Sequence, residues 1–268
     1  MENGAVNAKV TVEFLGVGEA CDETQPNTSL LLRGWTAGDS STSIQILLDC
    51  GFSVPHRYFQ ACSDPDLLDA VWISHFHGDH FFGIPLLLLR FWEMKRLKPL
   101  TIVTQPGGLE RVLAAMDLAY PGFAQKLTFP LHELALDAGH TVQVHGTTWR
   151  AAQTEHGQKN LSVRIDGGQW SLFYSGDGRP TAETQTLAEG CTLAVHEAFV
   201  LNDDNSIAGH GSVQGCLAWA RGAGVRRLVL VHMQRDVRRT QRREIHDTTH
   251  RCHDMEVLVP GSGDTVPL

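Results

Sequence analysis

No apolar run in this sequence is long enough to cross a membrane. The longest, residues 81–90, is interrupted by Gly83 and Pro85, whereas a transmembrane helix needs about 20 consecutive apolar residues. Residues 1–7 also lack the basic segment and the apolar run that mark a signal peptide. We therefore expect a cytoplasmic protein that does not associate with a membrane.

Cysteine pairs are absent as well. No CxxC motif occurs, and the six cysteines are scattered along the chain. Without a secretory signal, we interpret them as reduced thiols, which excludes a disulfide framework and a zinc knuckle. They are Cys21, Cys50, Cys62, Cys191, Cys216 and Cys252.

Positive charge is scarce. The chain has 22 Lys and Arg against 30 Asp and Glu, a formal net charge of −8, and this balance argues against a general nucleic-acid binder. The charge is uneven, however, because residues 221–251 contain nine Arg and only three acidic residues. This stretch could engage phosphate groups, or it could be a solvated helix face.

The composition is that of a globular protein. Hydrophobic residues make up 42% of the 268 positions and charged residues 19%, which allows a substantial core. No Pro-, Gly- or Ser-rich linker divides the chain, so we expect a single domain over residues 1–268. Strands are followed by helix–strand units, and this order occurs twice, which favours two similar α/β halves in one sandwich.

Hydrophobic periodicity and turn residues place the individual elements. A polar turn is expected at residues 38–40. The predicted strands are residues 9–15, 29–33, 43–48, 67–74, 101–104, 127–129, 141–145, 148–154, 161–165, 170–175, 192–195, 227–231 and 255–259. The predicted helices are residues 82–98, 109–118, 181–188, 212–221 and 240–249.

Four of the polar residues that point to chemistry lie directly after the predicted strand 67–74. There the sequence reads HFHGDH, and a chain of this composition would contain an HxHxDH string about 0.002 times by chance. Imidazole and carboxylate groups suit zinc, and also manganese or iron. His75 and His77 can reach one metal ion, while Asp79 and His80 can serve a second. A solvated histidine-rich loop, the alternative, fits poorly between an apolar strand and an apolar helix.

Three later residues stand at the ends of predicted strands. His156 follows strand 148–154, Asp177 follows strand 170–175, and His232 follows strand 227–231. Strand ends converge on one edge of an α/β sandwich, so these residues can complete the metal sites.

The ordered set of HxHxDH, a lone His, a GD pair and a strand-terminal His resembles the metallo-β-lactamase fold of dinuclear metallohydrolases over nearly the whole chain. The resemblance implies an αββα sandwich, with two mixed sheets flanked by helices, and two Zn²⁺ ions as cofactors, with Mn²⁺ or Fe as alternatives. It also implies that His75, His77 and His156 bind one metal, that Asp79, His80 and His232 bind the other, and that Asp177 bridges them.

Within this fold, the sequence is similar to the ribonuclease Z branch. YSGDGRP (residues 174–180) resembles its YTGDTRP segment, VHEAF (195–199) its HEAT motif, and GHGS (209–212) its HST motif. The resemblance implies that Glu197 and His210 orient the catalytic Asp and contact the scissile phosphate. Asp79 would orient the nucleophile or take its proton. Members of this branch are commonly dimers, and the apolar helix at residues 82–97 could supply the interface.

Two features depart from that branch. Asp177 lies only 21 positions after His156, which leaves no room for the long arm that grips tRNA. His232 is followed by MQRDV, where the branch often has a Ser and an Arg-Tyr pair. Neither departure touches the hydrolytic core. We therefore expect a metal-dependent phosphodiesterase acting on RNA or on smaller diesters.

Two other functions stay open. The same metals could hydrolyse another ester, such as a lactone, a thioester or a sulfate ester, although the HEAT-like and HST-like segments argue against this. A protein that binds metal without catalysis is the third interpretation, and the intact ligand set disfavours it.

Among the aromatic residues beside the cluster, Phe81, Phe82 and Trp92 are predicted to lie in the helix core, with Phe82 alternatively at the edge of the site.

Overall fold

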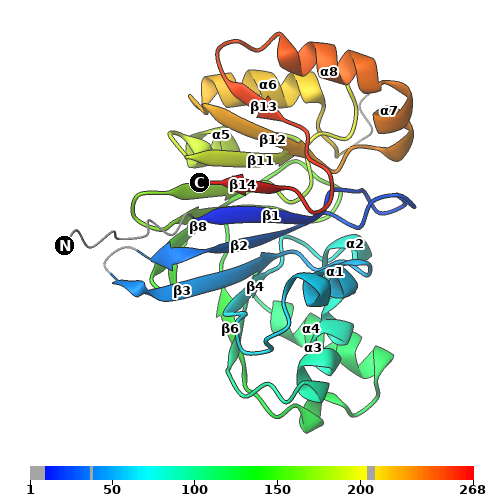
Figure 1. Ribbon diagram of the computed structural model, residues 1–268, viewed down its shortest axis with the longest axis vertical. Helices are drawn as coiled ribbons and strands as arrows, with labels where there is room; N and C mark the ends of the chain where they lie inside the picture. The colour runs from blue at the N-terminus through cyan, green and yellow to red at the C-terminus, as the bar shows by residue number, and fades with distance from the viewer. Residues whose placement is uncertain (1–9, 37–38, 204–208) are drawn as a thin grey trace, which may run out of the picture.

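The computed structural model describes residues 10–36, 39–203 and 209–268. Residues 1–7 and Gly38 of the predicted turn lie outside this part of the chain. Two sheets pack face to face, and helices cover the outer face of each (Figure 1). This arrangement confirms the expected αββα sandwich. In the described part of the chain, no helix is long and apolar enough to span a bilayer.

Each sheet contains seven strands. The first consists of β1 (Thr11–Gly16), β2 (Ser29–Thr36), β3 (Asp39–Leu48), β4 (Ala70–Trp72), β5 (Leu100–Thr104), β6 (Leu131–Ala135) and β14 (Thr265–Pro267), in the order β14-β1-β2-β3-β4-β5-β6. The second consists of β7 (Thr141–Val144), β8 (Thr147–Gln153), β9 (Leu161–Asp166), β10 (Ser171–Tyr174), β11 (Leu193–Glu197), β12 (Arg227–Val231) and β13 (Glu256–Leu258), in the order β13-β12-β11-β10-β9-β8-β7.

The helices are divided between the two halves of the chain, as Figure 1 shows. Those of the first half are α1 (Val54–Ala61), α2 (Gly78–Phe81), α3 (Ile84–Glu93), α4 (Gly108–Ala119) and the 3-10 turn η1 (Ala124–Lys126). Those of the second half are α5 (Ala182–Ala188), α6 (Val213–Gly222), α7 (Arg235–Thr240) and α8 (Arg242–His250).

The strands are apolar on both faces because both faces are covered. In β2, Leu30 and Leu32 point into the core between the sheets, whereas Leu31 points outward into the core beneath α1 and α3. This alternation follows from the two-residue period of a strand. The inner core includes an edge-to-face pair of Trp72 and Trp149, whose ring centroids are 6.0 Å apart.

Several predicted elements differ from those observed. The predicted strand 67–74 shortens to β4, and the strand predicted at 127–129 is observed instead as β6, after η1. The predicted helix 82–98 begins four residues early, breaks at Phe82 and Gly83, and ends before Lys95, whose φ is +60°. The predicted helix 240–249 corresponds to α8, and the separate helix α7 precedes it, with Gln241 between the two.

Helices α1 and α7 and strand β14 were not predicted. Helix α1 begins with a proline in its first turn, a common helix start, but eight residues give a weak periodic signal. Strand β14 has only three residues and is defined by its pairing with β1.

In α3, the apolar side chains Leu87, Leu88 and Phe91 are buried in the chain's own core. The expected homodimer stays a prediction.

A close backbone contact fixes α2 and α3 against the loop that follows β3. Gly83 donates a hydrogen bond to Cys50 O at 2.9 Å, and Cys50 donates one to His80 O at 2.7 Å. A Cβ atom added to Gly83 would stand 2.1 Å from Gly51 O, and one added to Gly51 would stand 1.9 Å from Asp79 O. Glycine at both positions therefore allows the segment that carries Asp79 and His80 to seat on the first sheet.

We predict that Gly83→Ala lowers the free energy of unfolding by about 2 kcal/mol, because the clash is with backbone and cannot be relieved by a side-chain rotation. The φ of Gly83 is −76°, which alanine adopts readily, so the contact alone is tested. Urea unfolding measures the change. Gly261→Ala is the control, since its added Cβ would approach only Asp264 Oδ2, at 3.8 Å. Equal stability of the two variants would contradict the packing described here.

Candidate metal centre

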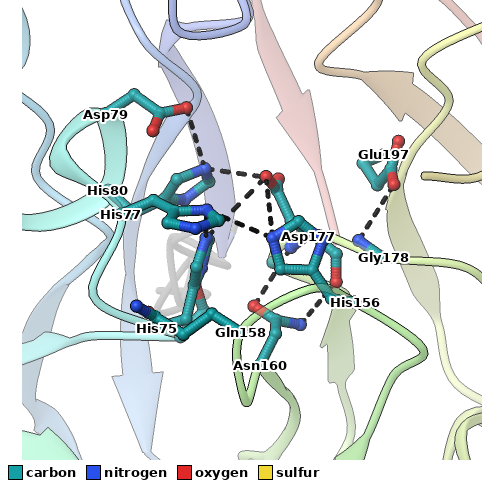
Figure 2. Close-up of polar contacts among 12 residues, drawn as sticks. His75, His77, Asp79, His80, His156, Gln158, Asn160, Asp177, Gly178 and Glu197 are labelled. Carbon is teal, nitrogen blue, oxygen red and sulfur yellow. Dashed lines mark hydrogen bonds and ion pairs between the residues drawn. The ribbon is translucent and has the colours of Figure 1, made fainter. Parts of the chain in front are cut away.

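The seven predicted ligands come together at one edge of the sandwich. Strands β8, β10 and β12 all run in the same direction in the second sheet, so His156, Asp177 and His232 emerge at the same edge. The loop after β4 and the short helix α2 bring the remaining four from the first sheet. Figure 2 shows the side chains of His75, His77, His80 and His156 gathered around Asp177.

One group of ligand atoms consists of three imidazoles and a carboxylate oxygen. His77 Nδ1 lies 3.0 Å from His75 Nε2 and 3.2 Å from His156 Nε2. Asp177 Oδ2 lies 3.8 Å from His75 Nε2 and 4.0 Å from His156 Nε2. These four residues could hold one metal ion.

The second group alternates carboxylates and imidazoles. His80 Nε2 lies 3.3 Å from Asp79 Oδ2 and 3.2 Å from Asp177 Oδ1. His232 Nε2 lies 3.2 Å from Asp79 Oδ2 and 3.4 Å from Asp177 Oδ1. The two oxygens of Asp177 therefore face different groups, as a bridging carboxylate requires.

These distances fit metal coordination. A tetrahedral zinc site with bonds of about 2.0–2.2 Å has ligand atoms about 3.3–3.6 Å apart, and the second group matches this spacing closely. His80 Nε2 and Asp177 Oδ1 are buried and make no hydrogen bond. Buried polar atoms without such partners are costly, and a cation between them would satisfy both. The residues present thus fit two metal ions.

Electrostatics divides the histidines into two kinds. Burial, together with the neighbouring His80, holds the pKa of His75 well below its usual value, and burial also lowers the pKa of His77. Burial likewise opposes charge on His232, but Asp177 and Asp79 outweigh it and raise its pKa to about 9. His75 and His77 are therefore neutral at pH 7, the form that binds metal. His232 must release a proton to become a ligand.

A carboxylate that sequence analysis did not single out holds His80. Asp49 Oδ2 accepts hydrogen bonds from His80 Nδ1 at 2.7 Å, from the Tyr174 hydroxyl at 2.7 Å and from the Ser74 hydroxyl at 2.8 Å. Its other oxygen accepts the Ser74 backbone N–H at 2.8 Å. Asp49 has a φ of +59°. The sequence indicates Asp49 only by its position directly after the predicted strand 43–48.

Other contacts orient the remaining ligands. His156 Nδ1 donates to Gly209 O at 2.7 Å, which directs Nε2 toward the cluster. The Asn160 side chain accepts the Asp177 backbone N–H at 3.1 Å and donates to the carbonyl oxygens of Ser175 and Asp177 (Figure 2). His232 has a φ of +56°, rare for a residue with a side chain. Such backbone strain is typical of functional sites.

Glu197 and His210 lie beside the cluster, as the motif resemblance implies. Glu197 Oε1 accepts the backbone N–H of Gly178 and of Gly211, each at 2.9 Å, and lies 3.3 Å from His210 Nδ1. It therefore ties the loop that carries Asp177 to the loop that carries His210. The His210 ring lies 5.1 Å from that of His156 and 5.9 Å from that of His232. Its side chain is 17% exposed, at the rim of the site.

The prediction that Phe82 lies in the helix core is wrong, and the alternative placement at the edge is correct. Its side chain is 54% exposed, because the helix breaks at this residue. The ring rests against Gly78, between the ligands His77 and Asp79: a Cβ added to Gly78 would stand 2.6 Å from Phe82 Cδ2. Phe81, in contrast, is buried as predicted.

Comparison with known proteins places the chain in a family. Residues 45–233 match the sequence profile of the "Beta-lactamase superfamily domain". Ribonuclease Z of Methanothermobacter thermautotrophicus is 25% identical over an alignment that covers 96% of this chain and 98% of that protein. Ribonuclease BN of Erwinia tasmaniensis is 24% identical, with 83% and 88% covered.

Solved structures share the fold. The metallo-β-lactamase fold protein YhfI of Bacillus subtilis has a TM-score of 0.75 and 23% identity, covering 97% of this chain and all of that one. The short form of human tRNase Z has a TM-score of 0.74 and 20% identity, covering 96% and 98%. Zn²⁺-bound PqqB of Methylobacterium extorquens has a TM-score of 0.67 and 16% identity, covering 96% and 100%. With a matching profile over most of its length and this architecture, the chain belongs to the β-lactamase superfamily and has the metallo-β-lactamase fold.

Proposed function

We propose that this protein is a dinuclear metal-dependent phosphodiesterase of the ribonuclease Z type, acting on RNA or on a smaller diester. One observation carries the proposal: two groups of ligand atoms share Asp177, with Glu197 and His210 joined beside them. The relatives named ribonuclease Z and ribonuclease BN support the proposed activity. The Zn²⁺-bound structure of PqqB, which has the same fold, supports zinc as the metal. The proposed ligands are His75, His77 and His156 for one Zn²⁺, Asp79, His80 and His232 for the other, and Asp177 for both.

When bound, the two cations supply Lewis acidity, which lowers the pKa of water and offsets negative charge on phosphoryl oxygens. Before metal binds, the charged imidazoles of His80 and His232 hold the pKa of Asp79 far below its usual value, despite burial, so this carboxylate is ionised at neutral pH. The ionised Asp79 carboxylate can orient a water molecule by accepting a hydrogen bond from it, and it can take the proton that the water releases. His210, oriented by Glu197, donates a hydrogen bond where charge develops on the phosphate.

The segment between His156 and Asp177 bears on the size of the substrate. It consists of the hairpin β9–β10 and its connecting turns, all within the second sheet. No arm projects from these residues, every one of which the structure describes. We therefore favour a short RNA or a small diester over an intact tRNA gripped at a distance.

We predict that Asp177→Ala removes both bound metal and activity, because each group loses an oxygen ligand. Hydrolysis of bis(p-nitrophenyl) phosphate should fall at least about 10³-fold, and elemental analysis should show less than one metal per chain. Asp254→Ala, which removes an exposed carboxylate paired with Arg221, is the control. A variant that is metal-free yet fully active would refute the proposed chemistry.

Asp49→Asn is expected to weaken metal binding about 10–100-fold, the usual effect of losing a charged partner behind a ligand imidazole. The amide keeps the size of the side chain and its capacity to accept from Ser74. Competition with a chromophoric chelator measures the affinity. Excess Zn²⁺ should restore activity, and activity that stays lost at saturating metal would contradict this positioning role.

His210→Ala should separate catalysis from metal binding. We expect kcat to fall about 10²–10³-fold, the effect of removing one donor to a developing charge, with metal content unchanged.

Parallel assays of the wild-type protein on bis(p-nitrophenyl) phosphate, a lactone and pre-tRNA should show turnover of the phosphodiester and none of the lactone. Preference for the lactone would replace the proposal with the other class of ester hydrolase.

A further inference from the structure

Most of the arginines in residues 221–251 are engaged by acidic residues. Six of the nine form ion pairs, so the positive charge of this stretch is largely compensated within the chain. The pairs are Arg221–Asp254, Arg227–Glu256, Arg235–Glu23, Arg238–Asp22, Arg239–Asp236 and Arg243–Asp247. Residues 221–251 therefore do not form a uniformly cationic surface that could bind nucleic acid.

One face of α8 is different. Arg242, His246 and His250 follow one another at intervals of four residues, which places them on the same side of the helix. The rings of His246 and His250 stack, with centroids 3.9 Å apart. The Arg242 side chain has no ion pair or hydrogen bond with any residue that the structure describes. All three side chains line a cavity of about 750 Å³.

The other walls of this cavity carry little free charge. The loop between β1 and β2 lies against α7 (Figure 1), where Arg238 binds Asp22 and Thr24, and Arg235 donates to Cys21 O at 2.7 Å. Asp22 and Glu23, the acidic residues of that loop that line the cavity, are thus paired with arginines. Apolar side chains also line the cavity, namely Met233, Ile245, Val257 and Leu258. Arg242 remains as the uncompensated cation.

The cavity adjoins the metal centre. Met233, which lines it, directly follows the ligand His232 and forms a β-bridge with Gly18. The strands that end at the cavity, β12 and β13, run parallel to β10 and β11. The cavity and the metal centre therefore lie along the same edge of the second sheet.

We propose that this cavity is a subsite for a second phosphate group of the substrate, held by Arg242 and flanked by the stacked rings of His246 and His250. The inference rests on the proposed phosphodiesterase function and specifies its substrate class: an oligonucleotide with at least two phosphodiester groups. A guanidinium suits this role, because its fork of donors matches phosphate oxygens. The stacked rings and apolar residues offer a surface for the neighbouring base.

The test compares two adjacent arginines. Arg242→Ala and Arg243→Ala remove the same charge from the same helix, but Arg243 is 91% exposed, lies 3.9 Å from Asp247, and does not line the cavity. For each holoenzyme, the KM is measured for a single-stranded tetraribonucleotide, which has several phosphates, and for bis(p-nitrophenyl) phosphate, which has one. Arg242→Ala should raise the ratio of the first KM to the second about tenfold, and Arg242→Lys should restore part of it. Arg243→Ala should leave the ratio unchanged.

Equal effects of the two substitutions would overturn the subsite, because only long-range charge would then be at work. An unchanged ratio in Arg242→Ala would do the same while leaving the phosphodiesterase function intact. If the wild-type protein cleaves neither substrate, the proposed function fails. Fluorescence anisotropy with a labelled phosphorothioate tetranucleotide then decides the subsite alone: binding weakened in Arg242→Ala and not in Arg243→Ala supports it, and any other result rejects it.

Discussion

Three carboxylates buried at one edge of the sandwich are the constraint on which the rest of the site depends. Asp49 is fully buried, and Asp79 and Asp177 are 7% and 2% exposed. Buried carboxylates persist only when donors or cations surround them. Donors from the chain satisfy Asp49, whereas imidazoles surround the other two. Two metal cations would offset the negative charge of Asp79 and Asp177. This requirement explains why carboxylates and imidazoles occur together at the site.

The fold meets this requirement through its strand ends. Parallel strands of the second sheet deliver three ligands to one edge, and the close contact of Gly83 with Gly51 seats α2, with two more, on the first sheet. Glu197 then joins the loops of Asp177 and His210 through a single oxygen. The protein therefore positions the ligands by backbone geometry and orients them by hydrogen bonds. This division is usual for metal sites.

The proposed ligands could be identified in the sequence because each follows an apolar strand, as His156, Asp177 and His232 do. Asp49 could not be, since its role depends on a positive φ and on donors up to 125 residues away in the chain. The helix break that exposes Phe82 has a local cause, in Gly83 and Pro85, and a tertiary one, in the hydrogen bond from Gly83 to Cys50 O. The charge of residues 221–251 gave no indication that Arg242 would line a cavity without an acidic partner among the residues that the structure describes.

The central claim is that Asp177 joins two metal ions within one site. Anomalous diffraction at the zinc edge, from crystals grown with Zn²⁺, tests it most directly. Two peaks should flank the Asp177 carboxylate, one about 2.0–2.2 Å from each oxygen, and His232 and His156 should contact different peaks. A single peak, or zinc bound away from Asp177, would contradict the account.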